Sequence, residues 1–540
     1  MSIFRTKIQD GSDTSEANKA DMQNLIDKMR GLEARAETLS EKRRARFEER
    51  GQLSPRERLA ALLDPGLPFL ELYNMASFLV DDDNPETSVP GASVLTGIGF
   101  VSGVRCLVFV DDSGINAGAS TSKTVEKALG CLDIALKQKL PFLHLVESAG
   151  ANLMTYTVEL WAHGGGMFAG LARLSAAGIP VITVLHGPST AGGAYQPGLS
   201  DYVIGVKKNG MAMLGGAALV RAATGEVSDD QTLGGVEMHA QTTGLIEYLA
   251  EDDAHGIEIA RDVVARLDWN GQLPARATEP TVEPALTTDD LISVVPIDYR
   301  KPYDVREVMA RLVDGSDFID FKPDYGPATV CIQTKVFGQA CGIIGNNGPI
   351  DPNGATKATH FFQLCEQAGH PVIFLNNTTG YMVGATYEHA GMIKHGSKMI
   401  QAVTNLSVPK ISLYIGASFG AGNYGMCGYA FEPDFLLTWP NAVTGVMGGE
   451  QAAGTMEQVM NNAAKRRGLP VDTGKMAAQS AAITAHFNHQ SDAFYTSGRL
   501  LDHGMIDPRD TRKVLGFCLE TCSEARARKL RPNSFGVARM

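Results

Sequence analysis

Apolar residues follow two patterns along this chain, a helical stripe near the N-terminus and strand-length runs beyond it. The stretch to about Leu63 is polar, but one set of apolar residues within it recurs at steps of three or four, namely Leu25, Met29, Leu32, Ala36 and Leu39. This spacing predicts an amphipathic helix whose charged remainder faces solvent. Such a helix more often packs against its own protein or a sister subunit than carries chemistry.

Short apolar runs that lead into small residues predict buried strands in both halves of the chain. In the first half, residues 140–146 run into Glu147-Ser148-Ala149-Gly150, and residues 179–185 run past Gly187 into Ala191-Gly192-Gly193-Ala194-Tyr195. In the second half, residues 371–375 run into Thr379-Gly380, and residues 408–415 run past Gly416 into Gly420-Ala421-Gly422-Asn423-Tyr424. Helical patterns alternate with these runs, which predicts an α/β fold.

The two halves repeat each other almost in register. Pro141 precedes Gly150 by nine residues, as Pro371 precedes Gly380, and the two prolines lie 230 positions apart. Pro180 and Pro409, which introduce the later strands, lie 229 positions apart. We therefore infer an internal duplication. The expected organisation is an N-terminal helical segment over 1–50, a first domain over 51–273, a Pro/Thr/Glu-rich linker over 274–288 and a second domain over 289–530.

Composition removes several classes of function. With 540 residues the chain should form more than one domain, and its net charge of −12 argues against a nucleic-acid-binding protein. Apolar runs are too short to span a membrane, and the first residues carry no signal-peptide pattern, so we expect a cytoplasmic protein. The eight cysteines contain no Cys-x-x-Cys pair, and Cys518 and Cys522 are spaced as on one helix face. We therefore expect no metal site.

The repeated turns suggest a specific chemistry. A strand that ends in small residues and leads into a helix leaves backbone N–H groups pointing into the space before the helix. Such amides can stabilise an oxyanion, because the donors are fixed before charge develops. The alternative is that the glycines only allow tight helix–strand packing, but the duplication in register favours oxyanion sites. Two such sites imply two carbonyl reactants, as in CO2 transfer from a carboxylated urea to a thioester enolate.

Several segments carry a resemblance to a known family. In the first half these are 54–58, 91–99, 147–153, 190–195, 222–226 and 233–235, and in the second half 376–384, 418–426, 439–442 and 447–453. From about Gly51 to beyond Gly449, the chain resembles the carboxyltransferase β subunits of biotin-dependent acyl-CoA carboxylases. The resemblance implies two tandem crotonase-like (ClpP/crotonase) domains related by internal duplication.

The resemblance also implies cofactors and partners. The first half would bind an acyl-CoA thioester and the second half biotin, at a site on the interface between two β subunits. Biotin would be attached covalently to a separate α subunit that carries the biotin carboxylase, and no Met-Lys-Met attachment tripeptide occurs in this chain. The implied assembly is a bacterial, cytoplasmic α6β6 complex, with no metal in this chain.

Site residues follow from the same resemblance. Gly192 and Gly193, with Ala149 and Gly150, would hold the thioester oxyanion, and Gly164 and Ala194 would lie on the substrate side. Ala421 and Gly422, with Gly380, would hold the ureido oxygen of biotin, and Thr379 and Gly420 would complete the biotin side. The biotin N1 would serve as the base. His163, His360 and His389 are other candidates, although most histidines are structural.

The expected substrate is a 3-methyl-branched enoyl-CoA carboxylated at its γ-carbon, because residues 418–426 resemble that branch of the family. Methylcrotonyl-CoA carboxylases typically carry His-Phe-Gly-Arg-Ile-Phe where this chain has His163-Gly164-Gly165-Gly166-Met167-Phe168. Losing a phenylalanine ring at Gly164 would leave room for a longer tail, which favours geranyl-CoA over 3-methylcrotonyl-CoA. Alternatively, the glycines form only a flexible helix entry.

Particular residues also suggest other classes of function. Gly416-Ala417-Ser418-Phe419-Gly420 matches the nucleophile elbow of serine hydrolases, with Asp434, His486, His489 and His503 downstream. Glu147 is a conceivable acid/base of an enoyl-CoA hydratase or isomerase. A biotin-dependent decarboxylase subunit and a non-enzymatic scaffold complete the alternatives.

Overall fold

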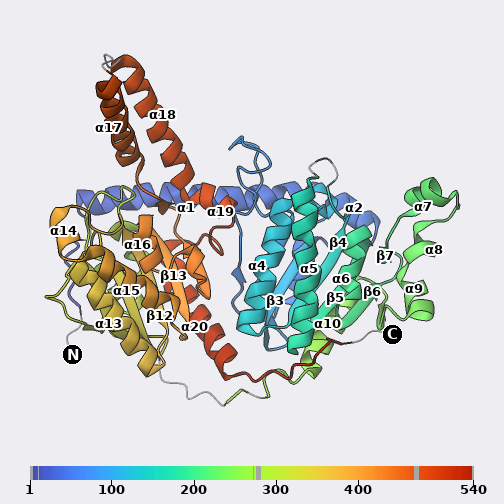
Figure 1. Ribbon diagram of the computed structural model, residues 1–540. Helices are drawn as coiled ribbons and strands as arrows, with labels where there is room; N and C mark the ends of the chain where they lie inside the picture. The colour runs from blue at the N-terminus through green and yellow to red at the C-terminus, as the bar shows by residue number, and fades with distance from the viewer. Residues whose placement is uncertain are drawn as a thin grey trace. The chain divides into compact units, whose positions relative to one another are not determined.

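The chain folds into two compact units, each built around its own mixed β-sheet (Figure 1). A computed structural model describes residues 4–9, 11–152, 154, 156–271, 273–274, 281–467 and 473–537. The N-half unit comprises Gly31–Arg276, Gly498–Leu500 and Thr521–Met540, and the C-half unit comprises Met1–Arg30, Ala277–Ser497 and Leu501–Glu520. Much of the predicted linker, at 275–280, lies outside the described residues.

The N-half sheet is antiparallel at one edge and parallel in its centre. Its order is β1-β2-β3-β4-β5-β6-β8, and β7 pairs with the end of β5. The pairs β1/β2 and β2/β3 are antiparallel, and every pair from β3 to β8 is parallel. The strands are β1 (Leu70–Glu71), β2 (Val94–Val101), β3 (Val104–Asp111), β4 (Phe142–Ser148), β5 (Val181–Thr190), β6 (Tyr202–Val206), β7 (Met211–Met213) and β8 (Tyr248–Ala250).

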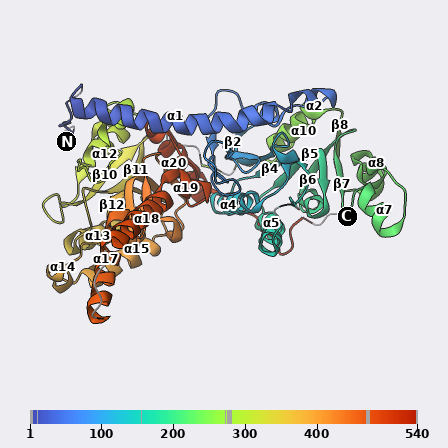
Figure 2. The ribbon, with the colours of Figure 1, turned by 90° about the horizontal axis from the view of Figure 1, so that it is seen from above.

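Helices cover both faces of this sheet, so its central strands are buried throughout (Figure 2). Helices α4 (Ser122–Gln138) and α5 (Val158–Ala177) pack together on one face, and α3 (Pro55–Leu62) and α10 (Asp253–Arg266) on the other. The remaining elements are α2 (Arg44–Glu49), η1 (Asn116–Gly118), η2 (Ala191–Ala194), α6 (Tyr195–Gly198), α7 (Ala217–Thr224), α8 (Asp230–Gly234), α9 (Val236–Met238) and η3 (His239–Thr243).

The C-half sheet has the order β14-β13-β12-β11-β10-β9, with β15 paired to the end of β13. Its strands are β9 (Ile319–Asp320), β10 (Thr329–Val336), β11 (Gln339–Asn346), β12 (Val372–Thr378), β13 (Lys410–Phe419), β14 (Phe435–Thr438) and β15 (Val443–Gly445). Gly342 of β11 abuts α13 (Pro352–Ala368), whereas Gly345, on the opposite face, abuts Met309 of α12 (Arg306–Leu312). Helices therefore sandwich this sheet as well (Figure 2).

The other helices of the C-half unit surround this sandwich. Helix α15 (Met392–Thr404) packs beside α13, and α17 (Gly449–Arg467) and α18 (Thr473–Ser491) form a hairpin that stands out from the sheet (Figure 1). The remainder are η4 (Thr288–Asp290), α11 (Leu291–Val294), η5 (Asp314–Ser316), α14 (Ala385–His389), α16 (Gly420–Gly425), η6 (Tyr429–Phe431), α19 (Ala493–Gly498) and η7 (Pro508–Asp510). The last helix, α20 (Thr511–Ala527), begins in the C-half unit and continues into the N-half unit from Thr521. Cys518 and Cys522 both lie on the buried face of α20, as their spacing predicts.

The internal duplication is confirmed down to irregularities of the sheets. Each half has an antiparallel hairpin followed by parallel strands, and the register shifts at the same point in each. The shift brings Ser148 opposite Ser189 in one sheet and Thr378 opposite Ser418 in the other. A short strand then pairs with the end of β5 in one half and of β13 in the other. The α/β prediction is therefore correct.

The predicted N-terminal helix is also present, as α1 (Asp13–Glu41). Met29, Leu32 and Ala36 lie on its buried face, as expected. The stripe differs from the prediction at its start, because Met22 and Ile26 are buried while Leu25 is only partly covered. Ile26 packs with Met22 and Ile292 in a small apolar cluster, and this tertiary contact sets the orientation of the helix.

Candidate functional site

The strand-to-helix turn has the same backbone conformation in both halves. Strand β5 ends at Thr190, and Ala191 then adopts a left-handed φ of +54° before η2 and α6. Strand β13 ends at Phe419, and Gly420 adopts a φ of +56° before α16. A left-handed residue disfavours alanine by about 1–2 kcal/mol but does not strain glycine. The first half therefore keeps this turn at a conformational cost that the second half avoids.

The four expected catalytic residues occupy equivalent places in these turns. Gly192 and Gly193 follow Ala191, and Ala421 and Gly422 follow Gly420. Gly192 and Ala421 are exposed, while Gly193 is half-buried and Gly422 is buried. The carbonyls of Gly192 and Gly193 accept the Tyr195 N–H, but their own N–H groups lie in the first turn, where a helix offers no acceptor. These amides are positioned to donate to an external oxygen.

A second turn lies beside the first in each half. Gly150 follows β4 with a φ of +84°, and Gly380 follows β12 with a φ of +117°. A Cβ on Gly150 would lie 3.4 Å from the Thr190 carbonyl oxygen, and one on Gly380 would lie 3.5 Å from that of Phe419. A Cβ on Gly422 would lie 2.8 Å from the Gly380 Cα. Each half thus brings its two predicted turns into contact, most tightly in the C-half unit.

The amides of the second turn are already engaged within the chain. Ala149 N–H donates to the Ala117 carbonyl at 3.1 Å, and Gly150 N–H donates to Ser148 Oγ at 3.1 Å. In the C-half unit, Gly380 N–H donates to Thr378 Oγ1 at 3.3 Å, while Thr379 is exposed. The amides of Ala149 and Gly150 would have to leave these acceptors before binding a ligand oxygen, whereas those of Gly192 and Gly193 would not.

Gly164 lies on α5 with open space where a side chain would stand. No heavy atom lies within 4 Å of a Cβ built at Gly164. One helical turn later, Phe168 packs edge-on to Tyr195 at 6.0 Å, and its ring lies 3.5 Å from a Cβ built on Gly192. The face of α5 that carries Gly164 and Phe168 therefore borders the N-half turn. Sequence reasoning missed Phe168, although its spacing from Gly164 was a usable signal.

Ala194, the last residue of η2, is partly buried. Its side chain packs against a buried cluster that includes Val146 and Leu185. In this structure Ala194 contributes to the core beneath the turn.

Ser418 does not have the surroundings of a hydrolytic nucleophile. Its side chain is fully buried, its Oγ donates to Asn376 Oδ1 at 3.0 Å, and it accepts from Asn423 Nδ2 at 2.8 Å. Asp434 instead accepts the Lys410 backbone N–H, and His503 Nδ1 accepts that of Leu436. Both hydrogen-bond partners of the Ser418 hydroxyl are asparagines, and no described histidine bonds to it, so the geometry does not support the hydrolase alternative.

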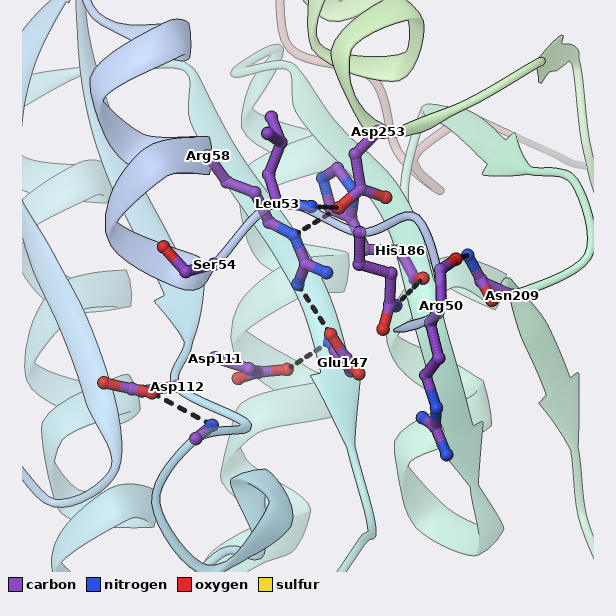
Figure 3. Close-up of polar contacts among 12 residues, drawn as sticks. Arg50, Leu53, Ser54, Arg58, Asp111, Asp112, Glu147, His186, Asn209 and Asp253 are labelled. Carbon is purple, nitrogen blue, oxygen red and sulfur yellow. Dashed lines mark hydrogen bonds and ion pairs between the residues drawn. The ribbon is translucent and has the colours of Figure 1, made fainter. Parts of the chain in front are cut away.

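Glu147 belongs to a buried charged cluster with Arg58 and Asp253 (Figure 3). Arg58 Nη1 contacts Glu147 Oε2 at 2.7 Å, and Arg58 Nε contacts Asp253 Oδ2 at 2.7 Å. His186 Nδ1 lies 2.9 Å from Asp253 Oδ1. Because Glu147 is buried and paired, it does not fit the exposed acid/base of a hydratase.

The pKa values in this cluster follow from its burial and charge pairing. Burial lowers the pKa of His186, in spite of the neighbouring Asp253 carboxylate. For Asp253, burial favours the neutral form, but His186 and Arg58 outweigh it and hold the pKa at about 2. Asp253 is therefore ionised at neutral pH.

The three candidate histidines are exposed and lie on helices. His163 is on α5, His360 on α13 and His389 on α14. Lys322 Nζ lies 3.1 Å from His360 Nδ1 in an exposed contact. Among the described contacts, none identifies any of the three as a base, and all three stay candidates.

Among the described side chains, no three His, Cys, Asp or Glu residues converge as metal ligands would. No helix in the part of the chain that the structure describes combines the length and apolarity needed to cross a bilayer.

Comparisons with known proteins agree along nearly the whole chain. Residues 46–537 match the carboxyl transferase domain family. The chain is 48% identical to a probable biotin-dependent acyl-coenzyme A carboxylase beta2 subunit of Mycobacterium tuberculosis, over 92% of each chain. It is 42% identical to the mitochondrial methylcrotonoyl-CoA carboxylase beta chain of Dictyostelium discoideum, over 91% of this chain and 83% of the relative.

A solved structure gives a further similarity. The β subunit of geranyl-CoA carboxylase from P. aeruginosa superposes with a TM-score of 0.94 and 46% identity, covering 100% of both chains. The expectation of two tandem crotonase-like domains is confirmed by this match together with the duplicated sheets.

Proposed function

The chain belongs to the carboxyl transferase domain family, and on that premise we propose that it transfers CO2 from carboxybiotin to the γ-carbon of geranyl-CoA. The observation that carries this proposal is the duplicated strand-to-helix turn, with first-turn amides at Gly192 and Gly193 in one half and at Ala421 and Gly422 in the other. Each reactant has one carbonyl oxygen that gains charge during the transfer. One turn for each oxygen accounts for the duplication.

The N-half turn would act on the thioester. The amides of Gly192 and Gly193 would donate to its carbonyl oxygen and stabilise the enolate that forms when the γ-proton leaves. Since the double bond conjugates the γ-carbon with the thioester, this charge is shared between oxygen and γ-carbon. The γ-carbon is then the nucleophile that takes up CO2.

The C-half turn fits a ureido group. Ala421 is exposed at the start of α16, and the glycine backbones of Gly380 and Gly422 leave no side chain between the two turns. When bound, biotin supplies the CO2 and a ureido nitrogen that can accept the substrate proton. The amides of Ala421 and Gly422 would hold the ureido oxygen, with Thr379, Gly380 and Gly420 around it. We keep this assignment, like that of the acyl-CoA to the N-half unit, as a proposal.

Geranyl-CoA is favoured by the open position at Gly164. An isoprene unit adds five carbons to methylcrotonyl-CoA, and burying them would be worth roughly 3–4 kcal/mol at about 0.8 kcal/mol per methylene. The space beside Gly164 lies on the α5 face that borders the N-half turn through Phe168. The similarity to a geranyl-CoA carboxylase β subunit over 100% of both chains supports the same choice.

3-Methylcrotonyl-CoA is the second candidate, because relatives at 42% identity carry that substrate in their names. The test compares kcat/KM for the two thioesters, with a biotin-carrying α subunit supplied and carboxylation followed by incorporation of labelled bicarbonate. We expect geranyl-CoA to be preferred at least tenfold. A preference for 3-methylcrotonyl-CoA would reject the substrate assignment, and decarboxylation without net carboxylation would favour the decarboxylase alternative.

The partners follow from the same proposal. A biotin carboxylase/biotin carrier α subunit would deliver the carboxyl group, and β subunits would pair so that their active sites lie at a dimer interface within an α6β6 assembly. Light scattering of the complex at working concentration tests this stoichiometry. We also propose a bacterial cytoplasmic location. It is supported by the eight cysteines, which all lie within the described ranges and are all free thiols.

A further inference from the structure

We propose that Arg58 and Glu147 form a positioning pair that fixes the N-half turn for the acyl-CoA half of the reaction. The effect of this pair on kcat rests on the proposed function, whereas its effect on the structure of the turn does not. Glu147 is the residue before Ser148, where strand β4 ends and the second N-half turn begins. Arg58 acts through Glu147, whose carboxylate it contacts.

Glu147 is held on three sides. Its carboxylate receives Arg58 Nη1 at 2.7 Å, and its backbone N–H donates to Asp111 Oδ2 at 3.2 Å. Its side chain crosses directly over Gly187 of β5, where any methyl group would overlap the Glu147 Cγ. Only a glycine leaves room for this crossing. Glu147, which leads into the turn after β4, therefore packs tightly against β5, which leads into the Gly192 turn.

Arg58 connects this lock to the rest of the N-half unit. The arginine is fully buried on α3, and its Nε contacts Asp253 at the first position of α10. Asp253 also accepts the Leu53 N–H at 3.0 Å, and Gln52 Nε2 donates to the His186 carbonyl at 2.9 Å. Segments far apart in the sequence thus converge on one guanidinium. Its planar fork suits two carboxylates at once, as a lysine would not.

The corresponding positions of the C-half unit indicate what the cluster around Arg58 does. Asn377 stands where Glu147 stands, and a methyl group at Gly416 would overlap Asn377 Oδ1 as one at Gly187 would overlap Glu147. Asn346 takes the place of Asp111, because the Asn377 N–H donates to Asn346 Oδ1 at 3.4 Å. The side chain that crosses a glycine and the hydrogen bond from its backbone N–H are therefore present in both halves.

What differs between the halves is charge. The C-half contacts join amides and hydroxyls, as between Asn376, Ser418 and Asn423. The N-half contacts join a buried arginine to two carboxylates. Neutral hydrogen bonds hold the C-half turn, whereas stronger charge-assisted ones hold the N-half turn. We take this asymmetry to mean that the acyl-CoA turn needs the firmer support.

The first measurement is independent of enzymatic activity. In the full-length chain, Glu147→Gln should speed amide hydrogen exchange in a peptide covering residues 148–152 and leave one covering 378–382 unchanged. The matched control is Glu307→Gln, since Glu307 pairs with Arg311 at 2.9 Å and both side chains are as buried as those of Arg58 and Glu147. Unaltered exchange at 148–152, or an equal change in the control, overturns the inference.

The second measurement uses the complex with its biotin-carrying subunit. Glu147→Gln should lower kcat for the acyl-CoA by about tenfold to a hundredfold, and the KM for free biotin, assayed with the β subunit alone, should stay within twofold of wild type. Arg58→Lys keeps a cation and should retain more activity than Arg58→Met. If Glu147→Gln fails to fold, Arg58→Lys decides, and an unchanged kcat in that variant overturns the inference. A wild-type complex that carboxylates no acyl-CoA rejects the proposed function, while the exchange experiment still decides the positioning role.

Discussion

Ala191 and Gly420 share one backbone conformation, with φ values of +54° and +56°, at the same point of the duplicated turn. An alanine in this region is uncommon, because its Cβ crowds the backbone. The N-half turn is therefore maintained by its surroundings against a local preference. Glu147, which precedes the neighbouring turn and is paired with Arg58, belongs to those surroundings.

Exchanging these residues should have opposite effects on the two units. Ala191→Gly should stabilise the N-half unit by about 1 kcal/mol, because it relieves the left-handed strain at some cost in chain entropy. Gly420→Ala should destabilise the C-half unit by about 1–2 kcal/mol, since it introduces the same strain. Thermal denaturation followed by calorimetry measures both. Gly454→Ala serves as control, because Gly454 lies in helix α17 with open space around it and should gain stability.

The close contact between Gly380 and Gly422 predicts different tolerance in the two halves. Gly422→Ala would place its Cβ 2.8 Å from the Gly380 Cα, a backbone atom that cannot move aside. Gly193→Ala meets only Ser189 Oγ at 3.1 Å, a rotatable hydroxyl. We expect Gly422→Ala to reduce kcat by about a hundredfold and Gly193→Ala by less. Equal losses from steady-state assays of both variants would show that the contact does not matter.

Filling the open space at Gly164 should change substrate preference. Gly164→Phe should lower kcat/KM for geranyl-CoA by about two orders of magnitude, following roughly 3 kcal/mol of lost burial, and spare 3-methylcrotonyl-CoA. Gly165→Phe is the matched control, because Gly165 also has open space but points to another side of α5. A Gly164→Phe variant that retains geranyl-CoA turnover would show that the acyl tail lies elsewhere.

Ser418 should prove structural when it is replaced. Ser418→Ala leaves Asn376 and Asn423 short of a partner, so the free energy of unfolding should fall by about 1–3 kcal/mol. A fluorophosphonate probe should not label wild-type protein, because the hydroxyl is fully buried. Labelling that disappears in Ser418→Ala would revive the hydrolase interpretation.

Stability should depend on pH through Asp502. Burial raises the pKa of this carboxyl to about 7, while Ser497 Oγ and Gly504 N–H donate to it. The unfolded chain loses this proton near pH 4, whereas the folded protein keeps it to about pH 7, so stability is lost as pH rises between these values. Asp502→Asn should match wild type near pH 4 and melt at a higher temperature above pH 7. A melting-temperature difference that is constant from pH 4 to 8 would contradict this account.

The sequence by itself determined the duplicated architecture and the place of the turns. Apolar runs of strand length, small residues after them and a spacing of 229 or 230 positions are local signals, and the strands β4, β5, β12 and β13 follow them closely. The same signals located Gly192, Gly193, Ala421 and Gly422. Their helical N-terminus is itself a local feature of the chain.

Only the tertiary structure decided which amides are available and what supports them. From the sequence, the N–H groups of Ala149 and Gly192 were equivalent candidate donors. In the structure the Ala149 N–H donates to the Ala117 carbonyl, whereas the Gly192 N–H lies at a helix start, where the helix offers no acceptor. The Arg58–Glu147 pair joins residues 89 positions apart. No periodicity encodes such a contact, because it depends on which buried charges meet when separate elements pack, and burial is a property of the whole fold.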